Sequence, residues 1–106
     1  MLVVNRFRVA AGDTDTFRAD VQVALDLLAA RAGYVDGHIG RNVDEPDLWV
    51  MQTRWRNVGS YRRALSAYDV KVGAVPLLSR AIDEPSAYEL LGDGAEPNTA
   101  RPRELR

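Results

Sequence analysis

Residues 2–9 combine β-branched and aromatic residues with an alternation of hydrophobic and polar positions over residues 6–9, which is typical of a β-strand. Successive side chains of a strand point to opposite faces. One face of this strand would carry Val3, Asn5, Phe7 and Val9. An asparagine in this row is unexpected, because a buried amide without a hydrogen-bond partner costs about 1–3 kcal/mol. Either the fold supplies a partner for Asn5, or its carboxamide faces a ligand.

A helical period follows the strand. Residues 13–16 are rich in side chains that cap helix N-termini. Apolar residues then recur at spacings of four, four and three, at Phe17, Val21, Leu25 and Leu28. This stripe predicts an amphipathic helix over residues 14–31, and we expect Gly33 to provide its C-terminal stop.

Two further strands are predicted over residues 34–44 and 48–56. The first is weaker, because Gly37 and Gly40 interrupt it, whereas the second has a strong alternating pattern. The turn between them consists of Glu45, Pro46 and Asp47. So short a connection is typical of a β-hairpin.

A second helix is expected to begin after Asn57, whose side chain is suited to capping it. Its apolar stripe would consist of Tyr61, Leu65, Tyr68 and Val72. We expect Pro76 to break this helix, so that residues 75–82 form a separate helical turn. Residues 86–91 predict a last strand, and the polar residues 92–106 predict a mobile tail.

The predicted order is βαββαβ, which is the ferredoxin-like α+β arrangement. It gives one domain over residues 1–91, with a four-stranded antiparallel sheet and both helices on one face. The third strand would turn Trp49, Met51, Thr53 and Trp55 toward the helices. The opposite face is too apolar for open water and too polar for a core. We therefore expect a homodimer in which two sheets face each other.

Composition narrows the possible partners. The chain has 106 residues, of which 46% are hydrophobic and 27% charged, and its net charge is −1. No basic field exists to attract nucleic acid or an anionic membrane. A signal peptide and a membrane-spanning run are absent from the sequence, so a cytoplasmic location is the expectation.

Several kinds of catalytic site lack the residues that they require. The chain has no cysteine and one histidine, His38, which excludes thiol catalysis and a cluster of metal-ligating histidines or cysteines. A glycine-rich phosphate loop is also missing. By strand parity His38 lies on the face away from the helices, where a surface or interface role is expected.

The stretches "VVNRFRV", "LWVMQTRW" and "NVGSYRRAL" resemble the antibiotic biosynthesis monooxygenase family over residues 1–91. The resemblance implies a dimeric α+β barrel. Some members of this family oxidise aromatic polyketides such as anthrones to quinones with molecular oxygen, without flavin, haem or metal, and relatives degrade haem. Both kinds use an asparagine on the first strand, which corresponds to Asn5.

The chain departs from this family at two positions. The tryptophan and the iron-binding histidine of the haem-degrading relatives correspond to Ala64 and Gly73. Without an axial histidine, haem would lack its usual protein ligand, so haem degradation is disfavoured. The helix tryptophan that some polyketide-oxidising members use is absent too.

The sequence therefore predicts a monooxygenase that acts on a small aromatic substrate without a cofactor, with Asn5 stabilising the substrate's carbanion. The resemblance places the substrate between the sheet and the helices. The predicted lining residues are Phe7, Trp49, Met51, Trp55, Tyr61, Leu65 and Tyr68. The general base remains unidentified.

Alternatives remain open for the site and for the protein. Asn5 can be a core amide bonded to backbone or to Thr53, and Trp49 and Trp55 can be ordinary core aromatics. A non-catalytic small-molecule-binding or regulatory dimer of the same fold is the alternative to an enzyme.

Overall fold

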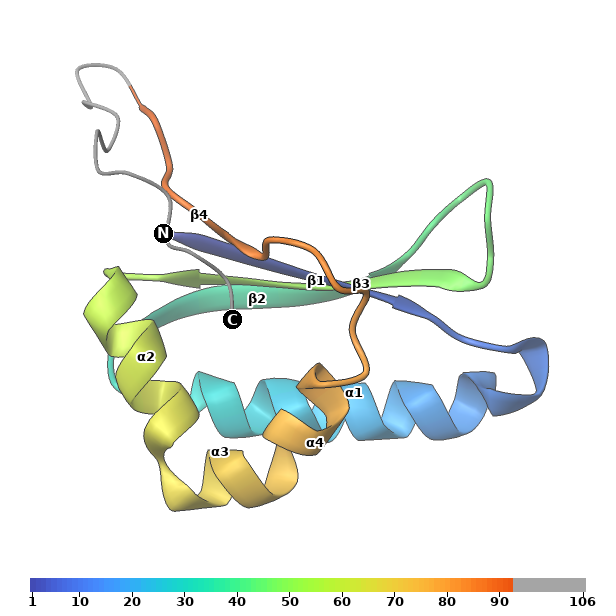
Figure 1. Cartoon of the computed structure of the whole chain (residues 1–106), viewed down its shortest axis with the longest axis horizontal. Coiled ribbons are helices and arrows are strands. Elements are labelled where there is room, and N and C mark those ends of the chain that lie inside the picture. Colours follow the sequence, from blue (N-terminus) through green and yellow to red (C-terminus); the bar gives the residue numbers. More distant parts are fainter. Residues whose placement is uncertain (93–106) are drawn as a thin grey trace.

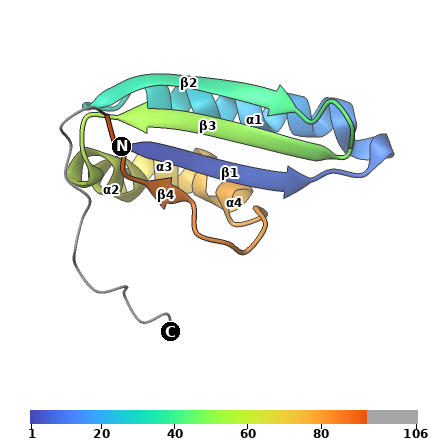
Figure 2. The same ribbon diagram turned by 90° about the horizontal axis from the view of Figure 1, so that it is seen from above.

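The computed structural model describes residues 1–92, so the tail predicted over residues 92–106 lies outside the described residues except for its first position. A four-stranded antiparallel sheet forms one layer (Figure 1). Its strands are β1 (Leu2–Arg8), β2 (Tyr34–Arg41), β3 (Leu48–Trp55) and β4 (Ala87–Tyr88). Their spatial order is β2-β3-β1-β4 (Figure 2), which confirms the ferredoxin-like prediction.

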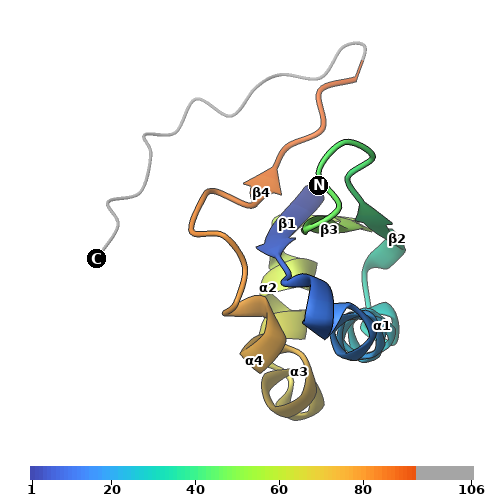
Figure 3. The ribbon, with the colours of Figure 1, turned by 90° about the vertical axis from the view of Figure 1, so that its right-hand side faces the viewer.

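The helices all lie against one face of the sheet (Figure 3). They are the short 3₁₀ turn η1 (Ala11–Asp13), α1 (Thr14–Ala29), α2 (Val58–Ser66), α3 (Tyr68–Gly73) and α4 (Val75–Leu78). In the described part of the chain, no helix lies on the opposite face of the sheet (Figure 1). Among residues 1–92, none of the helices has the length and apolar character needed to cross a membrane.

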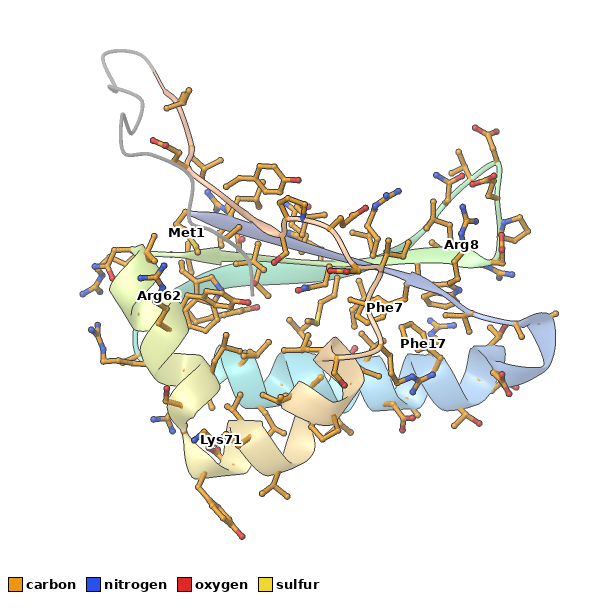
Figure 4. The ribbon with its side chains drawn as sticks, in the orientation of Figure 1. Met1, Phe7, Arg8, Phe17, Arg62 and Lys71 are labelled. Carbon is orange, nitrogen blue, oxygen red and sulfur yellow. The ribbon has the colours of Figure 1, made fainter. Side chains whose placement is uncertain are left out.

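The core lies between the sheet and the helices, as the alternation along the strands predicts. Val3 and Phe7 of β1 are 1% exposed, and Phe7 points from the sheet toward Phe17 of α1 (Figure 4). The two phenyl ring centres are 5.1 Å apart. On β3 the buried side chains are Trp49, Met51, Thr53 and Trp55. Apolar burial on this one face holds the two layers together.

The prediction of one long second helix is wrong. The chain leaves the helical conformation at Ala67, where ψ is 141°, and α3 then starts in a new direction. Tyr68 is therefore 82% exposed instead of facing inward, and Val70 is fully buried in its place. A separate helical turn does form around Pro76, as predicted, but as α4 it ends at Leu78 rather than at residue 82. Pro76 lies in the first turn of α4, where no backbone hydrogen bond from its nitrogen is required.

Two predicted boundaries also change. The hairpin connection runs over residues 42–47, because the Asn42 side chain accepts hydrogen bonds from the N–H groups of Asp44 (2.9 Å) and Glu45 (2.8 Å). These bonds fold the chain back before the predicted turn. The last strand is shorter than predicted, since only Ala87 and Tyr88 pair with β1.

Gly33 joins the helix layer to the sheet. The helix α1 ends at Ala29, so Gly33 is not its immediate stop but the turn residue before β2. Its φ of 90° is a conformation that L side chains rarely adopt. A Cβ at this position would lie 2.3 Å from the Cβ of Ser60 on α2, so only glycine fits here.

Candidate functional site

Asn5 lies at the middle of β1, paired with Met51 of β3, and it shares the helix-facing side with Val3 and Phe7. Those two neighbours are buried, whereas Asn5 is half-buried. Within residues 1–92 its side chain makes no hydrogen bond. The described part of the chain thus supplies no hydrogen-bond partner for this amide, neither backbone nor Thr53.

Thr53, the side chain considered as a partner for Asn5, is engaged elsewhere. Its hydroxyl accepts a hydrogen bond of 2.8 Å from the indole N–H of Trp55, and both residues are buried. Buried polar groups are nearly always paired, and this pair satisfies two of them together. The carboxamide of Asn5 is left with both its donor and its acceptor available.

An open cleft of about 300 Å³ borders Asn5. It lies between β1 and the residues that follow the first turn of α4, at the edge of the sheet where β4 pairs with β1. The lining side chains are Val4, Asn5, Leu78, Ser79, Ala81, Ile82, Asp83, Glu84 and Ser86. We call residues 79–86 the rim segment. This volume is at the lower end of the range for small-molecule sites.

The rim segment is fixed to β1 at both ends. The N–H of Ile82 donates to the carbonyl of Arg6 (2.8 Å), and the N–H of Val4 donates to the carbonyl of Ser86 (2.7 Å). Between these bonds, the Arg6 guanidinium donates twice to the carboxylate of Glu84, at 2.7 and 2.6 Å. The bidentate pair holds the segment in place beside the cleft.

Two carboxylates give the cleft its electrostatic character. The hydrogen bond from Arg6 holds the pKa of Glu84 below its usual value, so Glu84 is ionised and its charge is balanced. The neighbouring Asp83 is exposed and has no hydrogen bond or ion pair within residues 1–92. The cleft thus combines an amide donor and a carboxylate acceptor in a mainly polar lining, which also includes the apolar side chains of Leu78 and Ile82.

The predicted site residues do not lie together around this cleft. Phe7, Trp49, Met51 and Trp55 are buried in the core. Tyr61 and Leu65 of α2 are half-buried and pack against the core, and Tyr68 is exposed. None of the seven borders the Asn5 cleft. Contact between these residues and a substrate stays a prediction.

Sequence reasoning missed the rim segment. Its residues Asp83 and Glu84 stand in a stretch without helical or strand periodicity, which gives no sign of where they lie. The only sign in the sequence was the pair of adjacent acids, Asp83 and Glu84, because a carboxylate is a suitable partner for Arg6 of the first strand.

An aromatic cluster lies at the end of the sheet near α2. The Trp55 ring centre is 5.5 Å from that of Tyr34 and 5.6 Å from that of Tyr61. Burial raises the pKa of the Tyr61 phenol, so the hydroxyl keeps its proton at neutral pH and acts as a donor. Tyr61 therefore packs against the core through its ring, and its contact with a ligand stays a prediction.

The arginines of the helix-free face are paired within the chain. Arg6 binds Glu84, Arg8 lies 3.3 Å from Asp47, and Arg54 forms a bidentate pair with Asp36 of β2. The charges of these three arginines are therefore balanced by acids of the same chain. His38 pairs with Gln52 in register on the same face and is exposed, as its parity predicts.

Comparison with known proteins adds the family context. The model of a family described as antibiotic biosynthesis monooxygenase matches residues 1–73. SnoaB, a cofactor-independent oxygenase from Streptomyces nogalater, is 22% identical with a TM-score of 0.71, over 89% of this chain and 96% of SnoaB. A conserved protein from Methanosarcina mazei Go1 is 20% identical with a TM-score of 0.66, over 81% of this chain and 84% of that protein. These structural likenesses concern the fold. A search of curated proteins found no match.

Proposed function

The chain belongs to the antibiotic biosynthesis monooxygenase family, and from this we propose that it oxidises a small aromatic substrate of the anthrone type with molecular oxygen. The observation that carries the proposal is the free carboxamide of Asn5 beside a cleft. The fold that the chain shares with the oxygenase SnoaB supports it. The proposed reaction takes its electrons from the substrate itself.

Asn5 would stabilise the substrate after it loses a proton. Removal of a proton from the methylene carbon of an anthrone moves negative charge through the conjugated rings onto the carbonyl oxygen. The amide N–H of Asn5 would donate to that oxygen, and a donor aimed at developing charge lowers the barrier more than it strengthens ground-state binding. The apolar side chains of Leu78 and Ile82 would hold the ring system.

Asp83 is our candidate for the base. Its carboxylate lines the same cleft, is accessible, and has no partner within residues 1–92. Glu84 is the other carboxylate, but its hydrogen bonds to Arg6 lower its pKa and make it a weaker proton acceptor. The proton would thus pass from the substrate carbon to Asp83.

The oxygen step balances without a further reductant. The substrate carbanion gives one electron to dioxygen, and the resulting radical and superoxide combine into a peroxide on the same carbon. Loss of water from this peroxide, with the second hydrogen of that carbon, leaves a carbonyl. One oxygen atom ends in the quinone and the other in water.

The assay follows quinone absorbance and oxygen uptake with dithranol, a dihydroxyanthrone, as substrate. We expect wild type to exceed the protein-free rate, and Asn5→Ala to lower kcat about 100-fold. Asp83→Asn should lower it by a similar factor, about 100-fold or more. Asn42→Ala, in the hairpin connection far along the chain from the cleft, is the matched control. An Asn5→Ala rate equal to wild type would exclude the proposed role.

A non-catalytic binding protein is the second candidate. The observation that favours it is the burial of Phe7, Met51 and Trp55 in the core, since these predicted lining residues do not border the Asn5 cleft. In this case dithranol would bind with a measurable affinity, and neither quinone nor oxygen consumption would rise above the protein-free rate. Calorimetry under nitrogen, run beside the assay, separates the two candidates.

The proposal includes a homodimer formed through the helix-free face of the sheet. Leu2, Val4 and Val50 place half-buried apolar side chains on that face. A sheet face of mixed character that no helix covers is suited to a twofold contact with a second copy.

A further inference from the structure

A second groove lies at the other edge of the sheet, between α1 and the edge strand β2. Its volume is about 530 Å³, which is larger than that of the Asn5 cleft. The side chains that matter for its chemistry are Arg18, Gln22, Leu25, Ile39, Arg41 and Trp49. No residue of this groove takes part in the proposed oxidation.

The indole N–H of Trp49 has no hydrogen-bond acceptor. Its nitrogen is buried, and it is the one buried side-chain nitrogen or oxygen atom without a partner among residues 1–92. The other tryptophan, Trp55, shows the usual arrangement, with its N–H bonded to Thr53. A buried donor without an acceptor destabilises the folded protein, so an acceptor that reaches this N–H would recover part of that cost.

Two cations stand at the same end of the groove. The Arg41 guanidinium lies 5.5 Å from the centre of the Trp49 ring, and its Nε–H donates to the carbonyl of Pro46. Arg18 belongs to the helical turn that carries Phe17, whose ring centre is 5.5 Å from that of Trp49. Neither arginine has an ion pair among residues 1–92, whereas four other arginines do. This end of the groove therefore favours an anion.

The other end of the groove is apolar. Leu25 lies about two helical turns beyond Arg18, and Ile39 stands opposite on β2. Gly37 meets Leu25 there, because a Cβ on the glycine would be 2.7 Å from a Leu25 methyl carbon. The groove thus offers positive charge and a donor at one end and an aliphatic wall at the other.

We propose that this groove binds a small aromatic carboxylate. The carboxylate lies between Arg18 and Arg41, and the ring rests against Leu25 and Ile39. The exposed Arg41 side chain turns from the Trp49 ring toward the anion, which uncovers the indole N–H and lets it donate to a carboxylate oxygen. The two oxygens of a planar carboxylate can accept hydrogen bonds from both guanidinium groups and from the Trp49 N–H at the same time.

The test uses the two tryptophan indole N–H resonances in an NMR titration of isotope-labelled protein. The probe is 2-naphthoate, and 2-naphthalenemethanol serves as the uncharged control ligand. We expect the Trp49 resonance to shift saturably with naphthoate, while the Trp55 resonance stays in place because Thr53 already accepts its hydrogen bond. Trp49→Phe assigns the peaks.

Charge removal tests the geometry. Arg18→Gln and Arg41→Gln should each weaken naphthoate about tenfold, as expected for the loss of one charge-assisted hydrogen bond. Arg62→Gln changes an exposed arginine on α2 (Figure 4) and should leave the affinity unchanged. The backbone NMR spectrum of each variant verifies its fold.

Three results would overturn the proposal: no saturable shift of Trp49, equal binding of the uncharged ligand, or full affinity in the variant that lacks both groove arginines. Because the Asn5 cleft takes no part in this binding, the outcome is independent of the dithranol assay.

Discussion

Asn5 and Trp49 each carry a polar group on the helix-facing side of the sheet that finds no partner within residues 1–92. The Asn5 amide is half-exposed beside a cleft, so water satisfies it at little cost. The Trp49 N–H is closed off from solvent. The two polar groups therefore differ in access: the Asn5 amide borders an open cleft, whereas in our proposal the Trp49 N–H becomes accessible when the Arg41 side chain moves.

The Trp55–Thr53 bond predicts a measurable stability cost. Thr53→Val keeps the shape of the side chain but removes the acceptor, which leaves a buried indole N–H unsatisfied. We expect the free energy of unfolding to fall by about 1–3 kcal/mol. Denaturant titration measures it.

Thr16→Val, at an exposed position of α1, is the control for the change of residue type and should lie within about 0.5 kcal/mol of wild type. A Thr53→Val protein as stable as wild type would show that this hydrogen bond contributes nothing.

Alternation along β1 and β3 was enough to predict which residues form the core, since Val3, Phe7, Met51 and Trp55 are all buried. It could not predict which polar groups pair. Thr53 had two candidate donors on the same face, and only the side-chain rotamers of the folded protein decide that it binds Trp55 rather than Asn5.

Among the elements, the joint between Gly33 and α2 tolerates the least change. The carbonyl of Gly33 accepts a 2.7 Å hydrogen bond from the N–H of Arg56, and Ser60 of α2 packs directly on the glycine. One residue therefore connects the end of the first helix, the edge strand and the start of α2.

Gly33→Ala should destabilise the protein by about 1–3 kcal/mol or more, because the backbone is strained for alanine and the new methyl group collides with Ser60. Gly12→Ala, where nothing lies within 4 Å, is the matched control and should be harmless. Adding Ser60→Gly to Gly33→Ala should restore part of the loss in thermal melts. If the double variant melts no higher than Gly33→Ala, backbone strain alone accounts for the loss of stability.

The pair between Arg6 and the rim segment predicts a pH dependence. Because the pKa of Glu84 is lower in the folded protein than its ordinary 4.5, the pair stabilises the fold above that value. The stabilisation is lost as pH falls through the lower, folded value. Glu84→Gln should therefore lower the melting temperature at pH 7, and the difference from wild type should vanish in acid.

Asp20→Asn, an exposed change on α1 at a residue without an ion pair among residues 1–92, should show no such trend. A melting difference for Glu84→Gln that persists below the folded pKa would contradict the role of the carboxylate charge.

Element types and their order were predictable because periods of 2 and 3.6 residues differ clearly over strands and helices. The break at Ala67 was not predictable from the sequence. Tyr68 and Val72 continue the apolar spacing of α2 in the sequence, although the helix ends at Ser66 and the chain changes direction at Ala67. Buried Val70 shows that tertiary packing selected a different face.

For the whole molecule, the proposed dimer is tested through Val50 on the helix-free face of the sheet. Val50→Arg places a charge in the proposed contact between two sheets, where desolvation is costly, and should convert a dimer into a monomer in light scattering. Val43→Arg makes the same change at a residue that is 95% exposed in the hairpin connection and should remain dimeric. A wild-type protein that is monomeric in light scattering would contradict the proposed dimer.

The two proposed sites lie at opposite edges of one sheet, the Asn5 cleft beside β1 and β4 and the groove beside β2. The core between them, which includes Phe7, Trp49 and Met51, is packed and separates the two. Ligands at the two sites should therefore bind without competition.

The central claim is that the carboxamide of Asn5 is free to form a hydrogen bond with a bound ligand. The most direct measurement is the NMR signal of its side-chain amide during titration with dithranol under nitrogen, where binding occurs without turnover. We predict a saturable shift of this signal, identified by its loss in Asn5→Asp. Binding of dithranol that leaves the Asn5 amide signal in place, or no binding at all, would contradict the account.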